Sequence, residues 1–219
     1  MTSSEIGSLV YVAGQFEKTT GFLERGVFVQ NLKPGHYSVQ VEKEGYYPVV
    51  TEMIVHENFV SEFDALLVPV QPVFVSLEKT SEEYKEKSAL FAIPFPNIKN
   101  ENATSSKREG KNPIELLVEG GSLSVAFQGD KTSMPKFFCK MECKTNLLLW
   151  SGREKIHSAF FYPERNDSVI FSIDSGVFVL QIGDGRNIFP LYEGGTKTDV
   201  RLDEKKIYIK DGGEIFRLK

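Results

Sequence analysis

The sequence predicts an all-β protein built from a small N-terminal β-sandwich, one short helix, and C-terminal antiparallel hairpins. Three observations support this fold class. Seventeen Phe, eight Tyr and eighteen Gly among 219 residues favour strands and turns over helices. Short runs in which apolar and polar residues alternate are separated by Gly, Pro and Asn. In the C-terminal half, a pattern of apolar strand, glycine turn and second strand recurs.

Residues 1–78 are predicted to form the sandwich. In the stretch 36–43, apolar and polar residues alternate, so one face of this strand is expected to be buried and the other exposed. Pro34 and Gly35 predict a type II turn before it, with a positive φ at the glycine. Further strands are expected over residues 9–12, 26–30, 48–55 and 59–68.

Residues 79–113 are predicted to be a helix followed by a polar linker. Residues 80–83 have the spacing of a capping box, and residues 84–90 allow two helical turns before Pro94 ends the helix. Residues 99–112 contain no apolar side chain larger than Ala, which indicates a long loop.

Residues 114–219 are predicted to contain repeated β-hairpins that resemble propeller blades. The hairpins are expected over residues 116–125, 170–180 and 207–218. The last two begin at Ile170 and Ile207, close to the spacing of about 40–45 residues per blade. Since four blades need about 160 residues, this region is expected to form a partial propeller-like stack or a small sandwich.

The charge and the first residues limit the class of partner. A formal net charge of -4 argues against nucleic acid or an anionic membrane surface as a ligand. No apolar run approaches the roughly 20 residues of a membrane-spanning helix, and residues 1–7 lack the regions of a signal peptide. We therefore expect a soluble chain without an export signal, which would reach a membrane only through an anchor outside these residues.

The two cysteines, Cys139 and Cys143, are four residues apart. Along a strand they would lie about 13 Å apart, too far for a disulfide, whereas a helical turn or tight loop would bring them within reach. A disulfide, two unlinked thiols and a metal site all remain open. A metal site would need His36, His56 or His157, which are scattered and are expected at the surface or in loops, so no metal or cofactor is predicted.

No nucleophile elbow, zinc-protease motif or paired-carboxylate pattern stands out, so the protein is predicted not to be an enzyme. Residues 183–187 are glycine-rich but lack the remaining residues of a phosphate-binding loop, and are read as a turn. Tyr46, Tyr47 and Phe59 flank turns of the first unit, where aromatic side chains are predicted to form a contact patch.

Two sets of segments carry a resemblance to known proteins: residues 10–14, 31–39 and 42–46 in the N-terminal region, and residues 135–139, 160–167, 187–194 and 207–212 in the C-terminal half. With the first set, the N-terminal region resembles a PEGA domain, a small sandwich related to carboxypeptidase-regulatory and transthyretin-like folds. With the second set, the C-terminal half resembles the tail of some such proteins from small-genome candidate-phyla bacteria. The resemblance implies relatives that carry an N-terminal membrane anchor and face outside the cytoplasm, and it implies no catalysis.

From these observations we expect a non-enzymatic cell-envelope accessory or adhesion-type protein that binds a protein or an envelope polymer. One alternative is a carbohydrate-active hydrolase or lyase that uses dispersed carboxylates, which would need two carboxyl groups facing each other across a pocket. The other alternative is a structural spacer.

Overall fold

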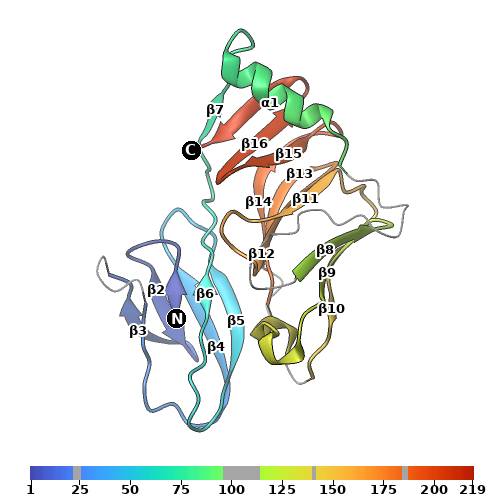
Figure 1. Ribbon diagram of the computed structural model, residues 1–219. Coiled ribbons are helices and arrows are strands. Elements are labelled where there is room, and N and C mark those ends of the chain that lie inside the picture. Colours follow the sequence, from blue (N-terminus) through green and yellow to red (C-terminus); the bar gives the residue numbers. More distant parts are fainter. Residues whose placement is uncertain (22–25, 96–113, 140–141, 184–186) are drawn as a thin grey trace. The chain divides into compact units, whose positions relative to one another are not determined.

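The computed structural model is dominated by strands in several antiparallel sheets, with a single α-helix among the residues that it describes (Figure 1). The predicted all-β class is therefore confirmed. Contacts divide the chain into two compact units: residues 1–71 with 183–189, and residues 72–182 with 190–219. The described residues are 1–21, 26–95, 114–139, 142–183 and 187–219, so the predicted linker 99–112 lies outside them.

The N-terminal unit has one large and one very small sheet. The large sheet is antiparallel in the order β3-β2-β4-β5, and the small one pairs β1 with β6 in parallel. The small sheet has only two residues in each strand, so the second layer of this unit is short. The strands are β1 (Thr2–Ser3), β2 (Leu9–Val12), β3 (Gln15–Thr19), β4 (Gly35–Glu42), β5 (Val49–Val55) and β6 (Asp64–Ala65).

The predicted alternation in residues 36–43 is confirmed. Val39 and Val41 of β4 are buried and Tyr37 on the same face is half-buried, while His36 and Ser38 on the opposite face are exposed. The turn before this strand differs from the expectation. Gly35 is not in the left-handed region and instead opens β4, pairing with Val55. The positive φ of this connection lies at Asn31, at 61°.

Two of the strand predictions, for residues 26–30 and 59–68, are wrong. Residues 27–33 form no strand, and of the predicted strand 59–68 only β6 is present. The reason is visible in the burial pattern. Leu66, Leu67 and Val68 are all buried, so three successive side chains face protein instead of alternating as a half-buried strand requires.

The C-terminal unit contains three sheets, in the orders β10-β9-β8, β11-β12-β13-β14 and β15-β16-β17-β7. Residues 187–189 at the start of β14 are grouped with the N-terminal unit. The three predicted hairpins are confirmed as β8–β9, β12–β13 and β16–β17. The strands are β7 (Phe74–Ser76), β8 (Ile114–Glu119), β9 (Ser122–Phe127), β10 (Asn146–Ser151), β11 (Ser158–Phe161), β12 (Ser168–Ile173), β13 (Gly176–Gln181), β14 (Asn187–Glu193), β15 (Asp199–Asp203), β16 (Lys206–Asp211) and β17 (Glu214–Leu218).

The three sheets meet at β11, which contacts both β8 and β15. Among the described residues the three sheets remain separate and do not close on themselves. The likeness of these sheets to propeller blades stays a prediction.

Strand β7 completes the last sheet. It pairs antiparallel with β17, and the N–H of Leu77 donates to the carbonyl of Ile215 at 2.8 Å. Residues 72–78, expected in the N-terminal sandwich, therefore belong to the C-terminal unit, because they fill the open edge of β17. The crossing between units falls at Pro72, as the prolines at 69 and 72 indicate.

The predicted helix is present as α1 (Glu82–Ala92). Its N-cap is Ser81, whose hydroxyl accepts a hydrogen bond from the N–H of Tyr84 at 3.1 Å, and the helix ends before Pro94. Tyr84 and Phe91 pack against a buried cluster of Leu77, Tyr208 and Ile215. The helix thus lies on the sheet of β15, β16 and β7 as part of the C-terminal unit (Figure 1). No helix in the described residues has the length and apolar character to cross a membrane.

Candidate binding groove

The N-terminal unit contains a groove of about 550 Å³. Its floor is the core-facing side of the large sheet, and its walls are the irregular segments 27–32 and 56–62. The floor is apolar, formed by Val12 of β2, Tyr37 and Val39 of β4, and Met53 and Val55 of β5.

The groove exists because the two layers of this sandwich differ in length. β4 and β5 have eight and seven residues, whereas β1 and β6 have two each. At one end of the sheet, Val41 and Val49 are completely buried. Towards the other end, Tyr37 and Met53 on the same face are only half-buried. No strand of the described residues covers this end, so apolar surface stays accessible.

The walls of the groove are shaped by local polar contacts. Asn31 and Asn58 have φ values of 61° and 62°, a conformation that Asn tolerates better than most side chains. The hydroxyl of Ser61 donates to the carbonyl of Ile54 at 2.6 Å, and the hydroxyl of Tyr37 donates to the carbonyl of Lys33 at 2.9 Å. Each wall is therefore tied to the sheet beside it.

The rim carries large apolar side chains in solvent. Phe28 is 69% exposed, Phe59 76% and Val60 61%. Single exposed apolar residues are common on proteins, but several around one concave surface are typical of an interaction site. The groove therefore combines an apolar floor with an apolar rim.

Besides Tyr37 on the floor, the ionisable side chains that line the groove in the described residues are His56, Glu57 and Glu62, all from one wall. The α-amino group of Met1 also lines it and donates to the carbonyl of Val27 at 2.9 Å. Burial lowers the pKa of this amino group, and Glu62 and Asp64 oppose that effect. Among the described lining residues there is no Lys or Arg side chain, so the wall 56–62 is acidic.

The structure does not bring the three predicted contact residues together. Phe59 lines the groove, whereas Tyr46 lines a separate depression, where the Lys43 ammonium lies 4.9 Å from the centre of its ring. Tyr47 is half-buried, and its N–H donates to the carbonyl of Val68 at 2.9 Å. Phe28 and Met53 were missed by the sequence reasoning, since both lie in segments that were read as ordinary strands.

The remaining candidates from the sequence lie apart from the groove or at its edge. His36 is exposed, His56 lies on the groove wall, and His157 Nε2 lies 2.8 Å from Asp174 Oδ1. No three His, Cys, Asp or Glu side chains in the described parts of the chain are grouped so that they could hold a metal ion.

Cys139 and Cys143 are joined as a disulfide, with their Cα atoms 3.9 Å apart. The pairing stays a prediction for the protein in solution. Intact-mass measurement after alkylation, with and without reduction, tests it: we expect both thiols to be blocked until a reductant is added. Alkylation of both cysteines without reduction would contradict the pairing.

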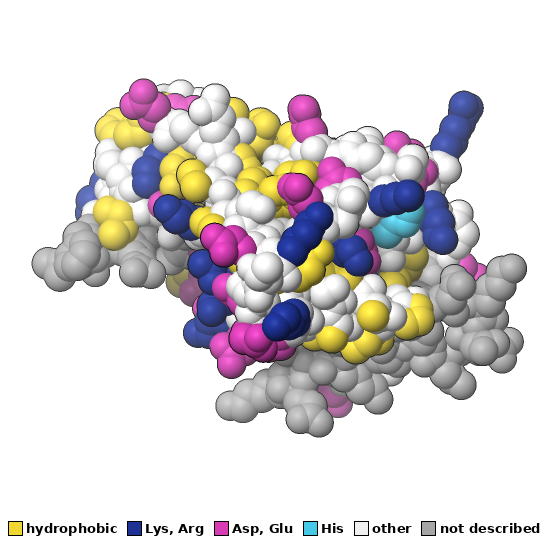
Figure 2. Space-filling view, turned by 90° about the horizontal axis from the view of Figure 1, so that it is seen from above, with side chains coloured by type: hydrophobic (Ala, Val, Ile, Leu, Met, Phe, Trp, Pro, Cys, Tyr) yellow, Lys and Arg dark blue, Asp and Glu magenta, His cyan; other side chains and the backbone are white. Residues whose placement is uncertain are grey.

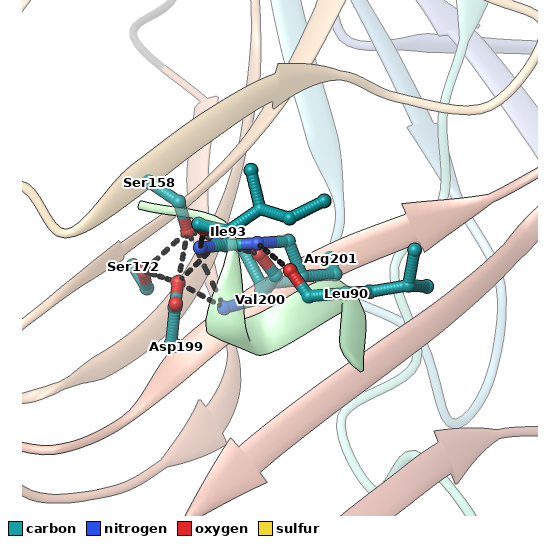
Figure 3. Close-up of polar contacts among 7 residues, drawn as sticks. All are labelled: Leu90, Ile93, Ser158, Ser172, Asp199, Val200 and Arg201. Atoms are coloured by element: carbon teal, nitrogen blue, oxygen red, sulfur yellow. Dashed lines mark hydrogen bonds and ion pairs between the residues drawn. The ribbon is translucent and has the colours of Figure 1, made fainter. Parts of the chain in front are cut away.

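A second group of polar side chains lies in the C-terminal unit (Figure 3). Asp199 of β15 accepts hydrogen bonds from the Arg201 guanidinium at 2.7 Å and from the Ser158 hydroxyl at 2.5 Å. The hydroxyls of Ser158 and Ser172 lie 2.9 Å apart. These residues come from β11, β12 and β15, and no residue pattern within any one strand indicates them.

The same arginine reaches the end of α1. Its guanidinium donates to the carbonyls of Leu90 at 3.3 Å and Ile93 at 3.0 Å, groups that have no partner within the helix (Figure 3). Ser158 and Ser172 are 0% exposed, so neither hydroxyl can meet a substrate. This polar cluster therefore joins two sheets and a helix, and it has the properties of a structural network.

Charged contacts also attach the first turns of α1. Lys87 donates to Glu86 and to Asp203, each at 2.5 Å, and these hydrogen bonds raise the pKa of the lysine. Glu83 accepts from Arg217 at 2.8 Å. Elsewhere, basic and acidic side chains are intermixed among the described residues on the face shown in Figure 2.

One comparison with known proteins bears on the N-terminal unit. Residues 2–71 match the family model of the PEGA domain, a range that coincides with the compact unit carrying the groove. No curated protein and no solved structure matches the chain.

Proposed function

We propose that residues 2–71, which match the family model of the PEGA domain, hold a segment of a partner macromolecule in their groove. The protein then acts as a non-enzymatic binding protein, displayed at the cell envelope. In the C-terminal unit, the hydroxyls of Ser158 and Ser172 are buried and hydrogen-bonded to each other, so this pair offers no binding surface.

The observation that supports this proposal best is the exposure of Phe28, Phe59 and Val60 around a concave apolar floor. The volume of about 550 Å³ falls within the range of roughly 300–1,000 Å³ seen for ligand pockets. The free energy falls when another surface covers these apolar side chains, because their area is then removed from water. A partner that binds in the groove would cover this apolar surface.

The absence of catalysis is part of the proposal. The lining carboxylates, Glu57 and Glu62, both belong to the segment 56–62. A glycosidase needs its two carboxyl groups on opposite sides of the bond that is cleaved. The envelope location rests on the resemblance to anchored relatives, and fractionation of native cells tests it. Recovery of the protein outside the envelope fractions would contradict that location.

The binding role is tested by selection from a random peptide display library on the full chain. We expect the selected peptides to bind about tenfold more weakly to the double variant Phe28→Ser/Phe59→Ser, because both rings are exposed anchors. Phe16→Ser is the matched control. Phe16 is also an exposed ring, 55% accessible on β3, but it does not line the groove. Peptides that bind both variants as tightly as the parent protein would overturn the proposal.

A further inference from the structure

We infer that the groove of the PEGA domain takes a peptide segment in which apolar side chains are flanked by Lys or Arg. This inference rests on the proposed function and specifies the chemistry of the partner. It follows from three properties of the groove: its apolar floor, its acidic wall, and the wall backbone that belongs to no sheet.

The floor selects apolar side chains. Val39 and Val12 are buried at its closed end, and Tyr37, Met53 and Val55 are half-buried towards its open end. This gradient of burial leaves a surface on which one or two aliphatic side chains can be covered. The exposed rings of Phe28 and Phe59 add contact area at the mouth.

The wall selects positive charge. Glu57 and Glu62 are both exposed, and both lie on the segment that also carries Phe59. The Met1 α-amino group, which also lies at the groove, donates to the carbonyl of Val27. Burial lowers the pKa of this amino group and the charge of Glu62 opposes that effect, so Glu57 is the lining carboxylate that this amino group does not sense. A cationic side chain that enters beside the apolar anchor therefore meets two carboxylates and no lining Lys or Arg in the described residues.

A peptide fits these properties better than a glycan or a membrane. The floor offers a sugar only one hydroxyl, that of Tyr37, which already donates to the carbonyl of Lys33 at 2.9 Å. Anionic lipid headgroups would be repelled by Glu57 and Glu62. The N–H and the carbonyl of Val27 are both bonded to Met1. Residues 28–32 border the groove outside any described strand, so the backbone of this part of the wall is not engaged in a ladder that would exclude a peptide.

The test uses three fluorescent nonapeptides with the same Leu-Leu centre, flanked on both sides by Lys, Gln or Glu, and measures their affinity for the full chain by fluorescence anisotropy. We expect the Lys peptide to bind about fivefold more tightly than the Gln peptide, with the Glu peptide weakest. The preference should disappear when NaCl is raised to about 0.5 M, because salt screens exposed charges.

Matched variants assign the preference to the wall. Glu57→Gln/Glu62→Gln is expected to remove the advantage of the Lys peptide. Glu52→Gln should leave it unchanged, since Glu52 is exposed on the other face of β5 from Met53. The Phe28→Ser/Phe59→Ser variant should weaken all three peptides.

The outcomes separate the two proposals. Equal binding of the Lys and Gln peptides, with dependence on Phe28 and Phe59, overturns the charge inference and leaves groove binding intact. Peptide binding that ignores both phenylalanines overturns groove binding itself. Binding of anionic phosphatidylglycerol vesicles that depends on the two rings, without peptide binding, would make the partner a membrane and would also overturn the inference.

Discussion

The two units bury their sheets to different extents, and the difference follows from what faces each sheet. In the N-terminal unit a four-stranded sheet faces a pair of two-residue strands, and Tyr37, Met53 and Val55 on its apolar face are only half-buried. In the C-terminal unit β12 is buried along its whole length, including Ser168 and Ser172. The length of the opposing layer, more than the polarity of the strand, therefore decides which surface is open.

The largest expected difference is in the free energy of unfolding when one phenylalanine of each unit is replaced by alanine. Phe171→Ala removes a ring that is 0% exposed and should lower the free energy of unfolding by about 4 kcal/mol. Phe59→Ala removes a ring at the groove rim and should change it by less than about 0.5 kcal/mol. Denaturation is followed by circular dichroism and by the fluorescence of Trp150, the only tryptophan. Equal losses for both variants would show that the rim is not open.

The polar cluster of the C-terminal unit gives the next largest effect. Asp199→Ala leaves the guanidinium of Arg201 buried without its carboxylate. This should lower the free energy of unfolding by about 3 kcal/mol, as measured by the fluorescence of Trp150 during denaturation. Lys205→Gln is the control. It removes the exposed pair with Glu164 and should cost no more than about 0.5 kcal/mol. A small effect for Asp199→Ala would mean that the cluster does not join the sheets.

A third variant tests whether β7 unfolds together with the C-terminal unit. Val75→Pro removes the N–H of a residue paired with Arg217 and places a proline in the strand, at a cost of about 2 kcal/mol. The loss should appear in the fluorescence of Trp150, because β7 completes a sheet of the C-terminal unit. A loss seen by circular dichroism without any shift of the Trp150 transition would assign β7 to the N-terminal unit.

The smallest expected effect concerns pH. Hydrogen bonds to Asp203 and Glu86 raise the pKa of Lys87 above the ordinary lysine value of 10.5. A raised pKa in the folded state stabilises the fold fully below the unfolded pKa, and this contribution is lost only as the pH rises towards the folded pKa. The difference in unfolding free energy between the parent protein and Lys87→Met should therefore be the same at pH 7 and pH 9. A clear decrease by pH 9 would contradict the pairing.

Local signals in the sequence predicted the parts of the fold that depend on neighbouring residues. Glycines between two apolar runs specify the hairpins, as at Gly120 and Gly212, where positive φ values of 54° and 55° are needed. Ser81 and Pro94 likewise delimit α1. These features need no knowledge of distant residues.

The parts that failed depend on residues far apart in the chain. β7 was placed in the wrong unit because its partner, β17, lies at the other end of the C-terminal unit. The groove could not be predicted, since it arises from the short length of β6 opposite β4 and β5. Asp199, Ser158 and Arg201 meet only when three strands and a helix are assembled, so no spacing in the sequence marks them.

The pairing of β7 with β17 also determines how the C-terminal unit would respond to tension. The N–H of Lys219 donates to the carbonyl of Val73 at 3.0 Å, so the two strands meet where the chain enters the unit and where its last strand ends. A pull between these two points would load the bonds of this ladder one after another, as in opening a zipper. The C-terminal unit is therefore expected to open from this edge when it is pulled between these two points.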